Sequence, residues 1–422
     1  MSYALMTDRY ELTMLQAALR SGKSERECVF EVFTRQLPSG RRYGVLAGVG
    51  RVLDAIADFR FGQDELDYLR KAEVVDEKTL EWLKNYKFSG SITGYREGEI
   101  YFANSPVMTV RGTFAEAVLL ETVILSILNY DSAVASAASR MHTAASGRFL
   151  AEMGARRAHE SAAIAAARAA FIAGFDATSN LEAGRSWGIP TMGTSAHSFT
   201  LLHDSEKEAF EAQIASMGPD TTLLVDTYDI TSAVKMAVEL TGGKVSAVRI
   251  DSGDLGSTAV EVRRQLDDLG AKQTKIVVTS DLDEHTIAAL AAAPVDRFGV
   301  GTSLVTGSGH PTAGFVYKLV AHTDGAEWTE VAKTSKSKTN RGGEKRASRL
   351  IESGSASAEL IGSDVGRPLQ VDLMSGGKAD KQYLGHKGVM AAKAHHLDAK
   401  AELPKTALRL SKGEPAIPTI FS

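Results

Sequence analysis

Cysteine is almost absent from this chain, since Cys28 is the single one among 422 residues. One thiol forms neither an internal disulfide nor a cysteine-rich zinc site, and it favours a reducing, cytoplasmic setting. The chain also lacks a strong excess of either charge, because its formal net charge at pH 7 is -4. We therefore expect no general attraction to nucleic acid or to an anionic membrane.

Long hydrophobic runs are missing as well. No stretch of about 18 apolar residues without charge occurs, so we expect no membrane span. The N-terminal sequence MSYALMTDRYELTM has neither a basic region nor a long apolar core, so we expect no signal peptide. The remaining composition, with 44% hydrophobic and 24% charged residues, is ordinary for a globular enzyme.

Short apolar runs that end in polar or glycine-rich turns recur after about Arg156. They alternate with helix-length segments, which is typical of βα units in a parallel sheet or barrel. Their continuous apolar character is typical of strands buried on both faces. The predicted strands are residues 188–194, 222–226, 247–251, 275–280 and 297–301.

The two ends of the chain have a different pattern. Residues 29–34 alternate like a strand, residues 106–129 end in an apolar helix, and the alanine-rich stretch 133–153 predicts a second helix. The strand-helix rhythm is lost after about Asp324, and the basic stretch 333–349 follows. We therefore expect an α/β fold in two parts. An irregular β/α barrel covers residues 116–329, and an α+β domain combines residues 1–115 with 330–422.

Carboxylates follow two consecutive predicted strands, where the chemistry of β/α barrels is located. Asp226 and Asp229 follow one strand, and Asp251 and Asp254 follow the next. Such carboxylates can bind sugar hydroxyls or a hydrated Mg²⁺ beside a phosphate. Each pair could equally cap the helix that comes after it, and the pattern alone leaves that alternative open.

Other polar residues follow the remaining strands. A glycine turn at 299–301 precedes a predicted helix and is typical of a phosphate site. His197 stands in the segment GTSAHSF, where a neutral imidazole could act as a base or a phosphoryl acceptor, although lone histidines are more often structural. Arg156 and Arg157 could hold a carboxylate or lie solvated on a helix.

Several motifs, taken in order along most of the chain, resemble those of the nicotinate phosphoribosyltransferases. They are TDRYELTM from Thr7, GFDATSN from Gly174, GTSAHSF from Gly193, VDTYD from Val225, RIDSGDL from Arg249 and FGVGTSL from Phe298. The resemblance implies transfer of the 5-phosphoribosyl group of 5-phosphoribosyl 1-pyrophosphate (PRPP) to nicotinate, a step of NAD salvage. It also implies coupling to hydrolysis of ATP, a co-substrate, through a phosphorylated histidine.

The resemblance assigns the catalytic residues. His197 matches the phosphohistidine position, and Asp226 and Asp251 are the catalytic carboxylates. Together with Arg249, the two carboxylates match positions around the ribose and the pyrophosphate. Gly253, in the same turn as Asp251, is a further substrate-binding candidate.

The phosphate groups of the substrates need partners of their own. The resemblance implies Mg²⁺ on the pyrophosphate, with Asp251 and Asp254 as its candidate ligands. Arg35 matches a cationic N-terminal position near the phosphates. The substrate-binding candidates after the last two predicted strands are Ser280, Asp281, Gly301 and Thr302. The serine, the glycine and the threonine match the pocket for the 5-phosphate.

Nicotinate has its own set of candidate residues. Arg156 matches the arginine that holds the nicotinate carboxylate, and Thr178 supplies a neighbouring hydroxyl. Ser179 stands where nicotinamide-using relatives have an aspartate, which favours the acid as substrate. Tyr10 matches a tyrosine that stacks on the pyridine ring from a neighbouring subunit, so the resemblance implies a homodimer. Met153 replaces the phenylalanine usually found on the other face of the ring, and methionine packs there less rigidly.

Three alternatives remain open at this point. A quinolinate phosphoribosyltransferase has a similar barrel, but its reaction releases CO₂ and needs no ATP. A nicotinamide-using homologue is opposed by Ser179. A non-catalytic barrel that only binds the sugar phosphate is opposed by His197 and the set of carboxylates.

Overall fold

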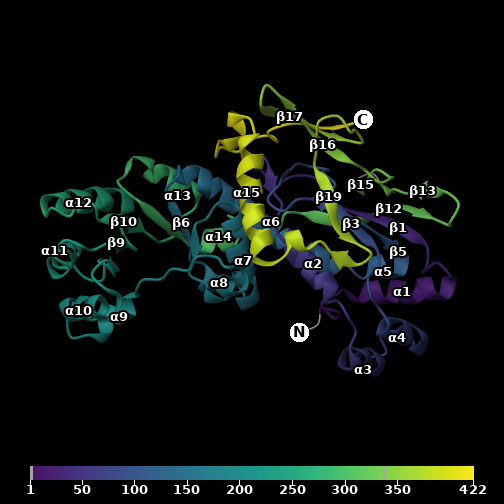
Figure 1. The fold of residues 1–422 in the computed structure, drawn as a ribbon, viewed down its shortest axis with the longest axis horizontal. Helices are drawn as coiled ribbons and strands as arrows, with labels where there is room; N and C mark the ends of the chain where they lie inside the picture. Colours follow the sequence, from purple (N-terminus) through teal and green to yellow (C-terminus); the bar gives the residue numbers. More distant parts are fainter. Residues whose placement is uncertain (1–2, 336–337) are drawn as a thin grey trace. The chain divides into compact units, whose positions relative to one another are not determined.

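The computed structural model describes residues 3–335 and 338–422. The chain divides into two compact units (Figure 1). One is discontinuous and combines the chain up to Ser136 with His310–Ser422, and the other is the continuous stretch Ala137–Gly309. The discontinuous unit contains mainly antiparallel sheets, whereas the continuous unit contains one parallel sheet. This confirms the expected mixed α/β fold class.

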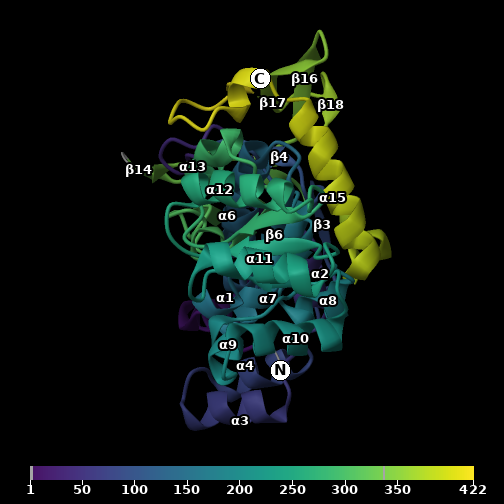
Figure 2. The same ribbon diagram turned by 90° about the vertical axis from the view of Figure 1, so that its left-hand side faces the viewer.

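The continuous unit is built around a six-stranded parallel sheet, a half-barrel with strand order β7-β6-β11-β10-β9-β8. Its strands are β6 Phe149–Glu152, β7 Ala177–Thr178, β8 Thr222–Leu224, β9 Ala247–Ile250, β10 Lys275–Val278 and β11 Arg297–Val300. Its helices are α7 Glu160–Ile172, α8 Leu181–Trp187, α9 His197–Leu202, α10 Glu206–Met217, α11 Ile230–Leu240, α12 Leu255–Asp268, α13 Glu284–Ala289 and α14 Thr302–Val305. Helices α11, α12 and α13 lie along one side of this sheet (Figures 1 and 2).

Four of the five strands predicted in this unit are present as β8 to β11. The strand predicted at residues 188–194 is wrong, because only an isolated bridge joins Thr191 to Thr178 there. Pro190 has no N–H to donate, so it joins the bridge through its carbonyl, which accepts the Thr178 N–H at 3.0 Å, and the pairing goes no further. In its place the sheet contains β6 and β7, which the sequence pattern did not reveal.

The helix predicted over residues 133–153 is also wrong in its extent. One helix, α6, runs over Glu121–Ala145 and joins that segment to the preceding apolar run. Ser146 and Gly147 then take positive φ angles of 50° and 81°, which end the helix. The chain enters β6 only two residues later.

The discontinuous unit contains a seven-stranded sheet of order β13-β12-β1-β5-β3-β19-β20 and a four-stranded sheet of order β18-β16-β17-β21. Its helices are α1 Arg9–Ser21, α2 Val49–Ala57, α3 Gln63–Lys71, α4 Glu77–Lys84, α5 Phe114–Val118 and α15 Gly385–Ala401. Its N-terminal strands are β1 Glu27–Thr34, β2 Gly44–Val45, β3 Ser91–Tyr95, β4 Ile100–Tyr101 and β5 Met108–Thr113. Its C-terminal strands are β12 Phe315–Thr323, β13 Trp328–Glu330, β14 Thr334–Ser335, β15 Lys338–Thr339, β16 Ala347–Glu352, β17 Ser355–Ile361, β18 Arg367–Pro368, β19 Gln370–Ser375, β20 Lys378–Ala379 and β21 Thr419–Phe421. The basic stretch 333–349 includes residues 336–337, which lie outside the described part of the chain.

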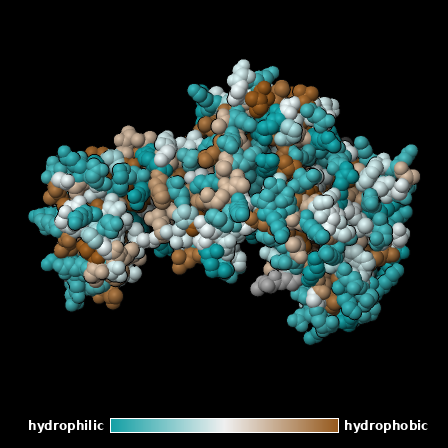
Figure 3. All heavy atoms as spheres, viewed as in Figure 1, coloured by the Kyte–Doolittle hydropathy of each residue, from teal (hydrophilic) through white to brown (hydrophobic). Residues whose placement is uncertain are grey.

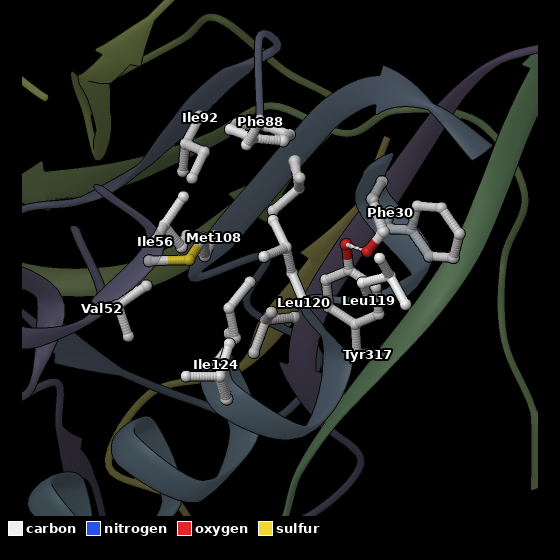
Figure 4. Close-up of a cluster of buried hydrophobic side chains, with 14 of the residues drawn as sticks. Phe30, Val52, Ile56, Phe88, Ile92, Met108, Leu119, Leu120, Ile124 and Tyr317 are labelled. Carbon is white, nitrogen blue, oxygen red and sulfur yellow. Dashed lines mark hydrogen bonds between the residues drawn. The ribbon is translucent and has the colours of Figure 1, made fainter. Parts of the chain in front are cut away.

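An apolar core holds the N-terminal and C-terminal segments of this unit together (Figure 4). Phe30 of β1 stacks on Tyr317 of β12, with ring centroids 4.7 Å apart. The Tyr317 hydroxyl donates to the Ala117 carbonyl at 2.9 Å. Leu120 and Ile124, at the start of α6 or just before it, are buried in the same core. Hydrophilic side chains dominate the surface face in Figure 3, and among the described residues no helix is long and apolar enough to cross a membrane.

A buried ionic cluster also joins the two segments. The guanidinium of Arg349 is fully buried and lies 3.1 Å from Glu99 and 2.7 Å from Glu359. Glu99 is also bound by Arg367 and His395, each at 2.9 Å. Burial raises the pKa of Glu99, but its hydrogen bond with His395 and the nearby arginine charges outweigh this and hold the pKa well below the usual range. The cluster therefore ties β16, β17 and α15 to the loop before β4.

Candidate active site

His197 and two carboxylates come together at the C-terminal ends of the parallel strands. His197 is the first residue of α9, and its Nε2 lies 3.8 Å from Asp226 Oδ1 and 3.9 Å from Asp251 Oδ2. Its Nδ1 lies 3.1 Å from the Thr227 hydroxyl, within hydrogen-bonding distance. The ring is therefore oriented on one side and faces negative charge on the other.

The carboxylate of Asp226 is buried, with 1% of its side chain exposed. Its Oδ2 accepts the Asp251 N–H at 2.8 Å and the Ser252 O–H at 2.7 Å. Its Oδ1, which faces His197, accepts no hydrogen bond from the described residues. An unpaired buried oxygen is costly, so the site is arranged for a charge or donor that comes to this atom.

The second carboxylate of each pair is a helix cap. Asp229 accepts the Ser232 N–H at 2.7 Å at the start of α11, and Asp254 accepts the Ser257 N–H at 3.1 Å at the start of α12. These hydrogen bonds lower the pKa of both carboxyls. The capping alternative is therefore correct for Asp229 and Asp254, whereas Asp226 and Asp251 face the histidine.

Arg249 links the histidine loop to the neighbouring strand ends. Its Nε donates to the Thr279 hydroxyl at 3.0 Å, and its Nη1 donates to Thr194 Oγ1 at 3.0 Å. Its Nη2 lies 3.3 Å from Asp251 Oδ1, which also accepts a short hydrogen bond from Thr279. Thr227 and Thr279 thus orient the charged groups. Sequence analysis missed both, since threonine at a strand end has no distinctive signal.

A cavity of about 290 Å³ opens beside these residues. It is lined by Met153, Arg156, Arg157, Arg249, Asp251, Thr279, Ser280, Asp281, Gly299, Gly301 and Thr302. A Cβ on Gly299 would lie 2.6 Å from Met153 Sδ, so glycine is needed for this close packing. Ser280 has φ 111°, a conformation that a non-glycine residue rarely adopts and that is typical of functional sites.

Arginine dominates the cationic side of this cavity, and Arg156 and Arg157 form the short 3₁₀ helix Ala155–Arg157. Both are exposed, as are Ser179, Gly253 and Asp281. Helix α14 after Gly301 has only four residues, so its dipole contributes little to binding an anion.

Thr178 differs from its neighbours because it is fully buried. Its hydroxyl donates to Glu152 at 2.6 Å and accepts the Asn180 N–H at 3.0 Å. The expected direct contact between Thr178 and the substrate therefore lacks a free hydroxyl. The sequence analysis had not identified Glu152, because it placed this residue in the predicted helix 133–153 rather than at the end of a strand.

Tyr10 and Arg35 belong to the discontinuous unit. Tyr10 lies on α1 with 42% of its surface exposed, and burial together with the charge of Glu121 raises its pKa. Arg35 directly follows β1 and lies 6.0 Å from the centre of the Phe33 ring. A ligand or partner could therefore contact the aromatic ring of Tyr10 and the guanidinium of Arg35.

The described residues contain no cluster of three or more histidine, cysteine or acidic side chains that could hold a metal by themselves. Mg²⁺ commonly binds one or two carboxylates and completes its shell with water and substrate phosphates. Asp251 is half-buried, lines the cavity and fits such a shared site. Asp254 fits it less directly, because its oxygens already cap α12.

The fold has close counterparts among solved structures. The structure of human nicotinic acid phosphoribosyltransferase matches 99% of this chain and 97% of its own, with a TM-score of 0.83 and 23% identity. The structure of the nicotinate-nucleotide pyrophosphorylase of Pyrococcus furiosus matches 95% of this chain and 96% of its own, with a TM-score of 0.76 and 24% identity. At such identities the likeness concerns the fold alone, and this chain shares the fold of those two structures.

Sequence comparison is more specific. The nicotinate phosphoribosyltransferase N-terminal domain model matches residues 5–129, and the nicotinate phosphoribosyltransferase family model matches residues 149–357. Nicotinate phosphoribosyltransferase pncB1 of Mycobacterium tuberculosis is 51% identical over 98% of this chain and 94% of its own length. The Bacillus subtilis nicotinate phosphoribosyltransferase is 37% identical over 83% of this chain and 74% of its own length. The chain belongs to the nicotinate phosphoribosyltransferase family, and its activity is that enzyme's step in NAD salvage.

Proposed function

We propose that the enzyme couples ATP hydrolysis to the transfer of the 5-phosphoribosyl group from PRPP to nicotinate, with His197 as the phosphoryl carrier. The observation that carries this proposal is the position of the His197 ring, held at Nδ1 by Thr227 and facing Asp226 and Asp251 at Nε2. A histidine with one nitrogen oriented and two carboxylates nearby suits a nucleophile that becomes cationic as it attacks.

In the ATP half-reaction, one ring nitrogen of His197 attacks the γ-phosphorus, and the bond from that phosphorus to the bridging oxygen of ADP breaks. The proton on the other ring nitrogen stays there and balances the charge of the phosphoryl group. The unpaired Oδ1 of Asp226 would stabilise the imidazolium character of the ring. Water later takes the phosphoryl group and regenerates the free histidine.

In the transfer half-reaction, the bond between C1 of the ribose and pyrophosphate breaks as the pyridine nitrogen of nicotinate approaches. The ribosyl centre becomes oxocarbenium-like, so it needs orientation and nearby negative charge rather than a protein nucleophile. Asp251 and Arg249 support this centre and its leaving group. Mg²⁺ would supply positive charge on the pyrophosphate, with Asp251 as its main protein ligand and Asp254 as a second candidate.

Substrate binding is proposed for the residues around the cavity. Ser280, Gly301 and Thr302 would hold the 5-phosphate, with Asp281 and Gly253 beside the sugar phosphate. Arg156 would bind the nicotinate carboxylate, with Ser179 leaving room for the acid and Met153 packing on the ring. Tyr10, supplied by the partner in a homodimer, would cover the ring's other face, and Arg35 would lie near the phosphates. The cytoplasmic setting remains a proposal that rests on the single, buried Cys28.

The test of this mechanism is His197→Ala. We expect loss of nicotinate-dependent ADP release, while slow transfer without ATP continues, because the histidine serves only the ATP half-reaction. Initial rates of ADP and nicotinate mononucleotide formation, each with and without ATP, measure both effects.

His203→Ala is the matched control, because His203 follows the same helix and its Nδ1 lies 2.8 Å from the Phe199 carbonyl, away from the carboxylates that face His197. ATP stimulation of His197→Ala equal to that of the wild type would contradict the assignment. The same assay with nicotinate, nicotinamide and quinolinate tests the alternative substrates.

A further inference from the structure

Glu152 ends β6 and has a buried carboxylate, with 1% of the residue exposed. Its Oε2 accepts the Thr178 hydroxyl at 2.6 Å, and its Oε1 accepts a short hydrogen bond from the Gly154 N–H. Its carbonyl accepts the Ser179 N–H at 2.8 Å. One residue therefore holds both the turn that leads to Arg156 and the strand end that carries Ser179.

Thr178 extends this connection on the other side. Its hydroxyl accepts the Asn180 N–H at 3.0 Å, and Asn180 in turn caps α8 by accepting the Ala183 N–H at 3.0 Å. Its carbonyl accepts the Met192 N–H at 3.0 Å, at the start of the loop that leads to the histidine. The hydroxyl has thus used its donor and one acceptor position within the protein.

The partners of the Glu152 side chain are a hydroxyl and a backbone N–H, and both are neutral donors. Burial raises the pKa of Glu152, because neutral donors offset only part of the lost hydration. Such a group costs stability, and buried polar residues without a structural benefit are rare. Its hydrogen bonds to Gly154 and Thr178 therefore point to a role in the geometry of the segments that it joins.

We propose that Glu152, acting through Thr178, is a positioning residue that fixes the nicotinate-recognition pocket. It holds Arg156 and Ser179 at the separation that nicotinate requires, without contacting the substrate itself. The proposal rests on the function proposed above for Arg156 and Ser179, and it replaces the expected substrate contact of Thr178 with an indirect role.

The experiment compares Thr178→Val with Thr178→Ser in the full-length enzyme, because valine removes the hydroxyl and serine keeps it. We expect Thr178→Val to raise KM for nicotinate about tenfold, as expected for loss of a hydrogen bond to a charged group. KM for PRPP and kcat should change much less, and Thr178→Ser should restore the wild-type KM. Glu152→Gln gives a second variant, which keeps the acceptor for Gly154 and should raise the nicotinate KM less than valine does.

Thr274→Val is the matched control. Thr274 is buried in the same unit and donates to the Val245 carbonyl at 3.0 Å, so its substitution should lower thermal stability without changing the nicotinate KM. Equal changes of both KM values in Thr178→Val, or an unchanged nicotinate KM in both Thr178→Val and Glu152→Gln, would overturn the proposal.

Arg156→Ala separates this proposal from the one on which it rests. If that variant leaves the nicotinate KM unchanged, the assignment of the carboxylate-binding arginine fails. If Arg156→Ala raises the nicotinate KM while neither Thr178→Val nor Glu152→Gln does, the positioning role alone fails.

Discussion

Two carboxylates that stand three positions apart after one strand have different partners in this enzyme. Asp226 is buried and directs an unpaired oxygen at His197, whereas Asp229 caps α11. Asp251 and Asp254 repeat the division one strand later. In each pair, the first carboxylate therefore lies in the candidate active site and the second caps the N-terminus of the next helix.

Ser179 gives a prediction at the scale of a single residue. It is exposed at the end of β7, next to the Glu152–Thr178 pair. In Ser179→Asp the new carboxylate should repel nicotinate and accept hydrogen bonds from the amide of nicotinamide. We expect the acid-to-amide ratio of kcat/KM to fall by a factor on the order of 10 to 100, as unfavourable like charges at a binding site imply.

The measurement is steady-state kinetics with nicotinate and with nicotinamide. Ser179→Asn is the control, because it adds similar bulk without charge and should change the ratio much less. An acid-to-amide ratio in Ser179→Asp equal to that of the wild type would count against the specificity role of this position.

The sequence predicted which residues lie at the strand ends, but not which of them face the reacting groups and which of them position their neighbours. The positions of Asp226 and Asp251 follow from strand spacing, because parallel strands bring their C-terminal ends to one edge. The position of His197 does not, since the strand predicted before it is absent. The roles of Glu152 and Thr178 do not follow, since each depends on the pairing of β6 with β7 and on burial. Neither of those short strands has a periodic pattern of its own.

At the scale of elements, α12 allows the capping and metal roles of Asp254 to be separated. Asp254→Ala should lower the free energy of unfolding by about 1 kcal/mol, because it removes an N-cap. Asp254→Asn should keep the stability, since asparagine caps equally well. It should also raise the Mg²⁺ concentration needed for half-maximal activity several-fold if the charge contributes to the metal site as proposed.

Chemical denaturation and a Mg²⁺ titration of activity measure the two effects, with Asp229→Ala as a capping control on α11. An unchanged Mg²⁺ requirement in Asp254→Asn would remove this residue from the proposed metal site and leave Asp251 alone there.

The elements that sequence analysis misplaced have different physical causes. The strands β8 to β11 are continuous apolar runs with a helix on either side, so their pattern is clear. The segment around Pro190 has the same apolar character but lacks an N–H for the ladder. The end of α6 depends on two residues with positive φ, and only one of them is glycine.

At the scale of the whole molecule, the buried cluster around Arg349 gives a stability prediction. Arg349→Met should destabilise the fold by about 3 to 5 kcal/mol, because it leaves Glu99 and Glu359 buried without their shared cation. The low pKa of Glu99 contributes stability that is present above pH of about 4 and is lost as the pH falls. The difference between wild type and variant should therefore shrink in acid.

Denaturant unfolding at neutral and acidic pH measures this difference. Arg346→Met is the control, since its ion pair with Asp364 is about 80% exposed on both sides and should contribute little. A variant Arg349→Met as stable as Arg346→Met would show that the cluster does not hold the unit together.

The return of the C-terminal segment to the N-terminal one was predictable in outline. The loss of the strand-helix rhythm after residue 324 indicated it, and β19 pairs with β3. Strand β12, which lies before that residue, also pairs with β1. The domain boundaries at 115/116 and 329/330 stay a prediction. Such boundaries depend on which core a helix joins, and the apolar face of α6 has no local feature that identifies its partner.

The pairing of β1 with β12 has a consequence for how the enzyme is made. Cys28 and His322 are partners in adjacent strands, yet nearly the whole barrel segment is translated between them. At about 5 to 20 residues per second, β1 waits on the order of tens of seconds on the ribosome before its partner exists. The stretch Ala137–Gly309 carries its complete sheet and can close first. β1 can pair early with β5, at Met108–Thr113, but its other edge has no partner until β12 is made. The nascent chain therefore exposes this one apolar strand edge for much of its synthesis.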